Sequence, residues 1–179
     1  MDLRTQKIYD SLIQAFEELI QEKSFDEITV NELCSRANTR RATFYKHFSD
    51  KYDFFQFMLG QQRKKIIQDA RDAISTDNPS EMLHSIVDIG LRFVEDNKEL
   101  LRSIENSSVA NIMLQTLIDQ MFDNKEFQFL PEDEMAVQFL IGGLNQCTRW
   151  WIVNINNVSR KQIQTQLYAL VDQYMDAMQ

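Results

Sequence analysis

The chain has 179 residues, of which 44% are apolar and 26% are charged, and its formal net charge is −8. This composition is typical of a globular protein with a hydrophobic core, and it excludes a disordered chain. No stretch approaches the roughly 18 consecutive apolar residues of a membrane span, and the first ten residues lack the apolar core of a signal peptide, so we expect a cytoplasmic protein. With only four Gly and two Pro, the sequence favours an all-α fold over a sheet.

Helical spacing of apolar residues begins near the N-terminus. It predicts a helix over about residues 3–23, which residues 24–28 end. Thr29 and Glu32 then form the signature of a capping box, in which each side chain satisfies the backbone N–H of the other residue. A short second helix is therefore expected to begin after Thr29 and to end near Ala37.

A tight turn and a third short helix follow. Asn38 stands where the turn needs left-handed backbone angles, which Asn tolerates better than other residues that have a side chain. The third helix is expected over about residues 40–48, with Phe44 and Phe48 facing the core. Two short helices joined by a turn of this kind are the layout of a helix-turn-helix, whose second helix enters the major groove of DNA.

Six more helices are predicted, which brings the total to about nine. Ser49 is expected to cap a long fourth helix that ends near Ile74, with Asp50 and Asp53 in its first turn. Pro79 and Pro131 are expected just before or at the start of two later helices. The last five helices are predicted at about residues 81–95, 98–104, 109–122, 132–155 and 160–177, the last one capped by Ser159 and Gln162.

Basic residues gather at the helix-turn-helix although the chain as a whole is acidic. Between Arg36 and Lys51 the local balance of charge is +4. A compact basic region on an acidic body predicts one localised contact with an anion such as DNA. Arg41 can form two hydrogen bonds with guanine, and Ala42 and Thr43 are small enough for close approach to base edges. The groups expected to face phosphates are Tyr45, Lys46, His47 and Lys51.

These residues resemble a known family. The stretch TVNELCSRANTRRATFYKHFSDKYDFF, from Thr29 to Phe55, resembles the DNA-binding domain of TetR-family regulators, and with the first helix the resemblance covers roughly residues 5–58. It implies a homodimer that holds two recognition helices about one DNA turn apart on a palindromic operator. It also implies a DNA-binding domain over residues 1–50 and a helical ligand-binding and dimerisation domain over residues 51–179. Carried over by position, the base contacts are Arg41, Ala42 and Thr43, and the phosphate contacts are Thr29, Tyr45, Lys46, His47 and Lys51.

The sequence departs from the family pattern at two positions. Asn38 stands where the family usually has Gly, and its tolerance of left-handed angles makes this change harmless. Arg40 stands where the family usually has a Ser-like helix cap. This leaves the cap of the third helix open and adds Arg40 to the residues expected to contact a phosphate or a base.

The last two helices carry more apolar surface than two helices of a small monomer usually hide. By analogy with the family, they are expected to form a four-helix interface between two copies, although a monomer core is the alternative. Gly142 and Gly143 lower helix stability by about 1 kcal/mol each, which suggests a close helix approach there. The interface candidates are Leu140, Leu144, Cys147, Trp151, Ile163, Leu167, Leu170 and Tyr174.

The resemblance also implies a pocket for an unknown small-molecule effector. Methionines and aromatic residues suit an adaptable apolar cavity between the fourth helix and the helices of residues 81–122, although the same residues suit ordinary packing. Ligand binding is expected to move the far end of the fourth helix and so change the spacing of the recognition helices. The candidate lining residues are Phe57, Phe93, Leu101, Met113, Leu117, Met121 and Phe139.

The resulting hypothesis is a DNA-binding transcription regulator, and more specifically a repressor. The first alternative is a TetR-like co-activator or adaptor that binds a partner protein instead of DNA. An enzyme is not expected, because the sequence has no catalytic triad order, no phosphate-binding Gly loop and only two histidines, His47 and His84. Cys34 and Cys147 are interpreted as small core residues, and neither a metal nor a cofactor is expected.

Overall fold

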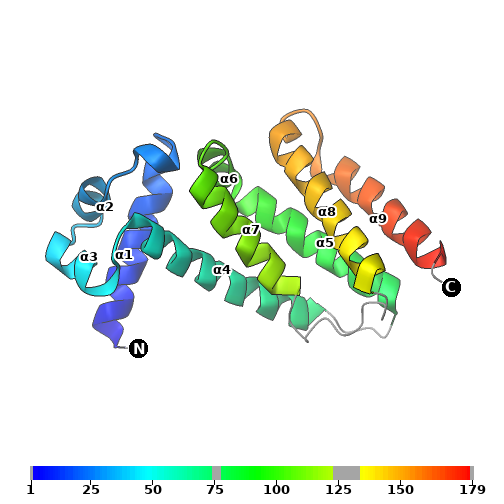
Figure 1. Cartoon of the computed structure of the whole chain (residues 1–179), viewed down its shortest axis with the longest axis horizontal. Helices are drawn as coiled ribbons and strands as arrows, with labels where there is room; N and C mark the ends of the chain where they lie inside the picture. The colour runs from blue at the N-terminus through cyan, green and yellow to red at the C-terminus, as the bar shows by residue number, and fades with distance from the viewer. Residues whose placement is uncertain (1, 74–77, 123–133, 178–179) are drawn as a thin grey trace. The chain divides into compact units, whose positions relative to one another are not determined.

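The computed structural model describes residues 2–73, 78–122 and 134–177, and the regular structure in these ranges is helical (Figure 1). The predicted all-α fold and the number of α-helices are confirmed for these residues. One short 3₁₀ helix, η1, stands where only a break was predicted. None of the described helices is long and apolar enough to cross a membrane. The elements are α1 (Leu3–Leu19), η1 (Phe25–Glu27), α2 (Val30–Arg36), α3 (Arg41–His47), α4 (Lys51–Ala73), α5 (Pro79–Asp96), α6 (Lys98–Ser103), α7 (Ser108–Phe122), α8 (Glu134–Asn154) and α9 (Arg160–Ala177).

The chain forms two compact units, which we describe separately. Unit 1 consists of Met1–Arg63 and Glu99–Ile118, and unit 2 consists of Lys64–Lys98 and Asp119–Gln179. The helix-turn-helix therefore shares its unit with the first half of α4, with α6 and with most of α7. The sequence analysis expected one boundary after residue 50, whereas unit 1 continues to Arg63 and also includes the later segment Glu99–Ile118.

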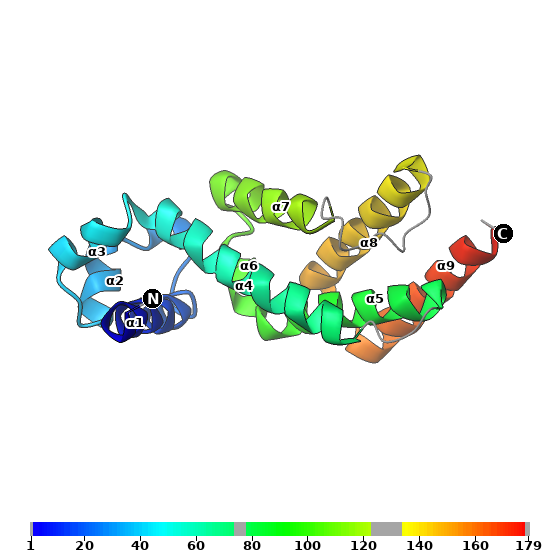
Figure 2. The ribbon, with the colours of Figure 1, turned by 90° about the horizontal axis from the view of Figure 1, so that it is seen from below.

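Aromatic side chains form the centre of unit 1. Five phenylalanines from α1, η1, α3 and the start of α4 are buried, and their rings contact one another, with 4.8 Å between the centroids of Phe25 and Phe55. Such ring pairs stabilise a fold by about 0.5–1.5 kcal/mol each beyond the area that they bury. Both ribbon views show α2 and α3 beside α1 (Figures 1 and 2). The five residues are Phe16, Phe25, Phe44, Phe54 and Phe55.

Local hydrogen bonds set the ends of the helices. The capping box of Thr29 and Glu32 is present at the start of α2, and Asn38 has a φ of 48°, so both predictions are confirmed. The predicted cap of α4 is wrong by one residue. Asp50 caps this helix, because its Oδ1 accepts the N–H of Tyr52 at 2.8 Å and that of Asp53 at 2.9 Å. A carboxylate is favoured over a hydroxyl there because it also interacts with the positive end of the helix dipole.

Unit 2 is built around the packing of α5 against α8 and α9. Trp151 of α8 is buried, and its indole N–H donates to the carbonyl of Val158 at 2.8 Å. A polar cluster joins α5 to α9, in which the Asp88 carboxylate accepts from the Tyr168 hydroxyl at 2.7 Å. The predicted Ser159 and Gln162 capping box at the start of α9 is confirmed.

Candidate nucleic-acid interface

The third helix has one face in the core of unit 1 and one face in solvent. Phe44 and Phe48 are buried, with 0% and 4% of their surface exposed, which confirms the predicted orientation. They lie four positions apart and so point to the same side of the helix. The exposed face carries Arg40, Arg41, Ala42, Tyr45 and Lys46, while Thr43 and His47 are half-buried at its edges.

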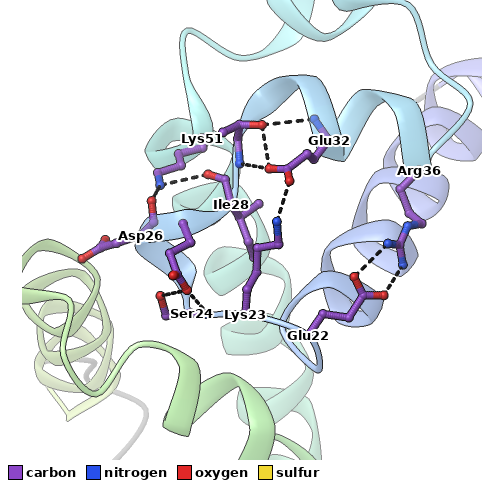
Figure 3. Close-up of polar contacts among 10 residues, drawn as sticks. Glu22, Lys23, Ser24, Asp26, Ile28, Glu32, Arg36 and Lys51 are labelled. Atoms are coloured by element: carbon purple, nitrogen blue, oxygen red, sulfur yellow. Dashed lines mark hydrogen bonds and ion pairs between the residues drawn. The ribbon is translucent and has the colours of Figure 1, made fainter.

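One of the basic residues counted in the sequence, Arg36, is paired with acidic side chains in the structure, so the exposed positive charge of the basic region is smaller than the count suggests. The Arg36 guanidinium donates to both carboxylate oxygens of Glu22, at 2.9 and 3.0 Å (Figure 3). It also lies 3.5 Å from the Glu18 carboxylate. The hydrogen bond from Arg36 lowers the pKa of Glu22 and raises the pKa of Arg36 itself. Arg36 thus ties α2 to α1, and its charge is neutralised locally.

The sequence predicts that Lys51 contacts a DNA phosphate, but in the structure its ammonium group donates hydrogen bonds to backbone carbonyls of the protein itself. Its Nζ donates to the carbonyl oxygens of Asp26 at 2.8 Å and Ile28 at 3.0 Å (Figure 3). It also donates to the carbonyl oxygen of Phe25 at 3.0 Å. It also lies over the Phe25 ring, 5.0 Å from the centroid. Burial lowers the pKa of Lys51. Because an ammonium has three N–H donors, all of its donors are used within unit 1, where they join the start of α4 to η1.

Three cations remain on the outer face of α3. Arg40, Arg41 and Lys46 are exposed, and none of them forms an ion pair with a described residue. The Arg41 guanidinium lies 5.7 Å from the centroid of the Tyr45 ring, a cation–π contact along the helix. Arg40 occupies the N-cap position but its side chain makes no capping hydrogen bond, which answers the question left open by the sequence.

Thr29 lies at the other end of the helix-turn-helix. Its hydroxyl donates to the Glu32 carboxylate at 2.7 Å and accepts the Glu32 backbone N–H at 3.2 Å. Lys23 donates to the other oxygen of the same carboxylate. The hydrogen bonds from Lys23 and then Thr29 lower the pKa of Glu32 to about 2. This second local ion pair fixes the start of α2.

We predict that Glu32 makes the protein sensitive to acid. The pKa of a free glutamate is 4.5 and that of Glu32 is about 2, so its stabilising contribution is complete above pH 4.5 and is lost as the pH falls towards 2. Thermal melts of the wild type and Glu32→Gln should therefore differ by a constant amount at and above about pH 5, and the difference should shrink steadily as the pH falls to about 2. A difference in melting temperature that does not change with pH would contradict this assignment.

His47 contacts a residue that the sequence analysis did not select. The hydroxyl of Tyr9 in α1 lies 3.3 Å from Nδ1 of His47, and the two rings meet edge to face with their centroids 5.3 Å apart. Tyr9 shares the inward face of α1 with Leu12 and Phe16 at helical spacing. That spacing indicates a packing residue, but it does not reveal which group the hydroxyl reaches.

The residues proposed for an effector pocket are divided between the two units. Phe57, Leu101 and Met113 belong to unit 1, and Phe93 and Phe139 belong to unit 2. Phe57 packs in the helix-turn-helix core, 4.6 Å from the Tyr9 ring and 5.3 Å from the Phe48 ring. Leu101 is buried, Met113 and Phe93 are half-buried, and Phe139 is 75% exposed. The side chains of Leu117 and Met121 lie outside the described residues.

The proposed interface residues also separate into two groups. Leu140, Trp151, Ile163 and Leu167 are buried within the chain, as the alternative of a monomer core requires. Leu144, Cys147 and Tyr174 are half-buried, and Leu170 is exposed. The sequence analysis did not include three other exposed apolar residues of α8 in the interface. Together with Phe139 they form a stripe at helical spacing, which we call the α8 stripe: Met135, Phe139, Trp150 and Val153.

Comparison with known proteins supports the resemblance. Residues 12–57 match the family described as bacterial regulatory proteins, tetR family. YxbF, an uncharacterized HTH-type transcriptional regulator of Bacillus subtilis (strain 168), is 32% identical over 68 residues, which are 37% of this chain and 18% of that protein. DhaS, the HTH-type dhaKLM operon transcriptional activator of Lactococcus lactis subsp. lactis (strain IL1403), is 26% identical over 100 residues, which are 56% of this chain and 48% of that protein. The chain therefore spans less than half the length of either relative in these matches.

Solved structures share the fold over nearly the whole chain. The fatty acid degradation regulator FadR from Bacillus halodurans has a TM-score of 0.68 and 14% identity, covering 96% of this chain and 95% of that one. FadR from Bacillus subtilis, in complex with stearoyl-CoA, has a TM-score of 0.66 and 15% identity, covering 93% and 97%. Residues 12–57 of this chain are therefore similar to the tetR family of bacterial regulatory proteins, and the chain shares its fold with the two solved regulators.

Proposed function

We propose that the protein is a transcription repressor that binds a palindromic operator as a homodimer and responds to a small molecule. The observation that carries this proposal is the exposed row of Arg40, Arg41 and Lys46 on α3, none of which pairs with a described acid. The buried Phe44 and Phe48 hold this row in place. A helix anchored on one face and cationic on the other is suited to the major groove.

In the proposed complex, Arg41 binds guanine, and Ala42 and Thr43 allow close approach to the bases. Arg40 and Lys46 neutralise phosphates, while Thr29, Tyr45 and His47 supply uncharged phosphate contacts. Lys51 supports this surface from within unit 1 through its three backbone carbonyls.

The proposal is tested by the salt dependence of binding to DNA from upstream of the gene itself. The two cations assigned to phosphates in each protomer, Arg40 and Lys46, give four phosphate contacts in a dimer and a slope of log Kobs against log salt of about −4. Fluorescence anisotropy between about 50 and 200 mM salt measures this slope. If no genomic fragment shows salt-sensitive binding, the repressor is excluded and the adaptor that binds a protein is favoured.

A second candidate function is activation, which one relative supports. DhaS, described as a transcriptional activator, is similar to this chain over 100 residues. A promoter reporter measured with and without the gene separates the two, since loss of a repressor raises expression and loss of an activator lowers it.

The homodimer is proposed to form through the α8 stripe and Leu170. Phe139 lies on this face and stacks near Tyr174 of α9, with 6.4 Å between ring centroids. Gly142 lies between Phe139 and Trp150 along the same exposed side, and no atom outside its own helix lies within 4 Å of a Cβ added there. The space beside Gly142 is therefore open for a helix of a second copy.

We predict that Gly142→Ala weakens the dimer although it stabilises α8. Alanine favours a helix over glycine by about 1 kcal/mol, whereas a methyl group in a close helix contact costs roughly 1–3 kcal/mol and raises the dissociation constant about tenfold or more. Sedimentation velocity across a dilution series measures this constant. Gly60→Ala in α4 is the matched control, because its Cβ also meets no atom within 4 Å. Equal dimerisation of the two variants would exclude close approach at Gly142.

The response to an effector is proposed to pass through contacts inside unit 1. Ser107, between α6 and α7, is buried, and its hydroxyl donates to the Asp26 carboxylate of η1 at 2.8 Å. Lys51, the first residue of α4, holds the backbone of the same turn. A shift of α6 and α7 would therefore reach η1 and the start of α4 directly. Stearoyl-CoA, the ligand of the Bacillus subtilis neighbour, is the first effector to titrate against operator affinity at constant salt.

A further inference from the structure

Tyr9 and His47 form a contact between α1 and the recognition helix. The Tyr9 hydroxyl lies 3.3 Å from His47 Nδ1. The Tyr9 ring is also packed against Phe57 at 4.6 Å and Phe48 at 5.5 Å between centroids. The Phe57 and Phe48 rings therefore determine where the Tyr9 hydroxyl lies. Tyr9 precedes the segment that matches the family, residues 12–57, so the match says nothing about it.

The chemistry of the two groups determines the direction of this hydrogen bond. A neutral imidazole has one N–H donor and one nitrogen that accepts. A phenol hydroxyl is a good donor and an imidazole nitrogen is a good acceptor, so the arrangement in which Tyr9 donates to Nδ1 is favoured. The ring proton is then on Nε2, because which nitrogen carries it is decided by the hydrogen bond that the other one makes.

Nε2 of His47 is the group left to contact DNA. This nitrogen lies on the other side of the ring from Nδ1, and no hydrogen bond joins it to a described residue. It is also not one of the buried polar atoms that lack a partner, so it is accessible to a ligand. His47 is half-buried and follows the exposed Lys46 on α3. An N–H in this position can donate to a phosphate oxygen without adding a charge.

We propose that Tyr9 is a positioning residue for DNA binding, which holds His47 in the tautomer with the proton on Nε2 and directs that N–H at an operator phosphate. The inference rests on the proposed function, because it needs a bound duplex. It also predicts the type of contact. A neutral donor contributes affinity without releasing a counterion, so its loss leaves the salt dependence of binding unchanged.

The test is Tyr9→Phe, which keeps the ring packing and removes only the hydroxyl. Operator affinity is expected to fall about fivefold, as for the loss of one neutral hydrogen bond in each protomer, with the slope against salt unchanged. In the free protein, the ¹⁵N spectrum of the His47 imidazole should change from one tautomer to a mixture of two. An unchanged melting temperature shows that packing is intact.

A second test repeats Tyr9→Phe in a His47→Gln variant. It distinguishes an effect of Tyr9 on the His47 tautomer from an effect of Tyr9 on the packing of the core. In His47→Gln, the amide Nε2 can donate to a phosphate without help from Tyr9, so adding Tyr9→Phe should have no further effect. An equal loss of affinity in both backgrounds, or wild-type affinity and tautomer in Tyr9→Phe, overturns the inference. If the wild type itself binds no DNA, the proposed function fails first and the inference fails with it. If the wild type binds and only Tyr9→Phe behaves unexpectedly, the inference alone fails.

Discussion

The double variant Arg41→Ala, Lys46→Ala is expected to bind its operator about a thousandfold more weakly than the wild type. Each arginine that binds guanine through two hydrogen bonds contributes about 1–3 kcal/mol of discrimination, and a dimer uses two of them. The loss of Lys46 removes a phosphate contact from each protomer in addition. Both side chains are exposed and unpaired with described acids, so the substitutions should leave the fold intact. Anisotropy titrations with specific and random duplexes at one salt concentration measure the effect.

The matched control is Lys64→Ala, Lys65→Ala, which removes the same charge from exposed positions of α4. A general electrostatic attraction to DNA would fall equally in both double variants. The proposed recognition helix instead requires a large loss for the α3 variant and a small one for the α4 variant. Unchanged binding by the α3 variant would show that DNA is held by another surface.

Lys51→Met is expected to lower the free energy of unfolding by about 2–3 kcal/mol, because hydrogen bonds from a charged group are among the stronger ones and their acceptors would be left without a donor. The carbonyls of Phe25, Asp26 and Ile28 all accept from Lys51. Phe25 is fully buried, so the turn around η1 cannot move into solvent without exposing its ring. Urea unfolding followed by circular dichroism measures the change.

Lys46→Met serves as the control for stability, since surface substitutions usually change it by less than about 0.5 kcal/mol. The two lysines should show opposite behaviour. Lys46→Met should reduce the salt slope of operator binding and keep the stability, whereas Lys51→Met should reduce the stability and keep the slope. A reduced slope for Lys51→Met would restore Lys51 as a phosphate contact.

Much of the fold was predictable because its signals act over short distances. The capping boxes of Thr29 with Glu32 and of Ser159 with Gln162 join residues three positions apart. The left-handed angle of Asn38 depends on its own side chain, and the inward face of α3 follows from the spacing of Phe44 and Phe48. One local signal was ambiguous. Ser and Asp are both common helix N-caps, so the sequence alone did not distinguish Ser49 from Asp50. In the structure, Asp50 accepts the backbone N–H groups at the start of α4.

The sequence by itself thus determined the helices, the helix-turn-helix and the side of α3 that faces outward. The tertiary structure decided which of its cations are available. Arg36 is neutralised by Glu22, 14 positions away, whereas the N–H donors of Lys51 are occupied by backbone carbonyls 23 to 26 positions away. It also placed Trp151 inside the chain and Trp150 beside it at the surface. Composition gives the number of charged residues, and periodicity gives the apolar face of each helix. The partner of each side chain depends on how segments distant in the sequence pack together, and a local sequence pattern does not contain that information.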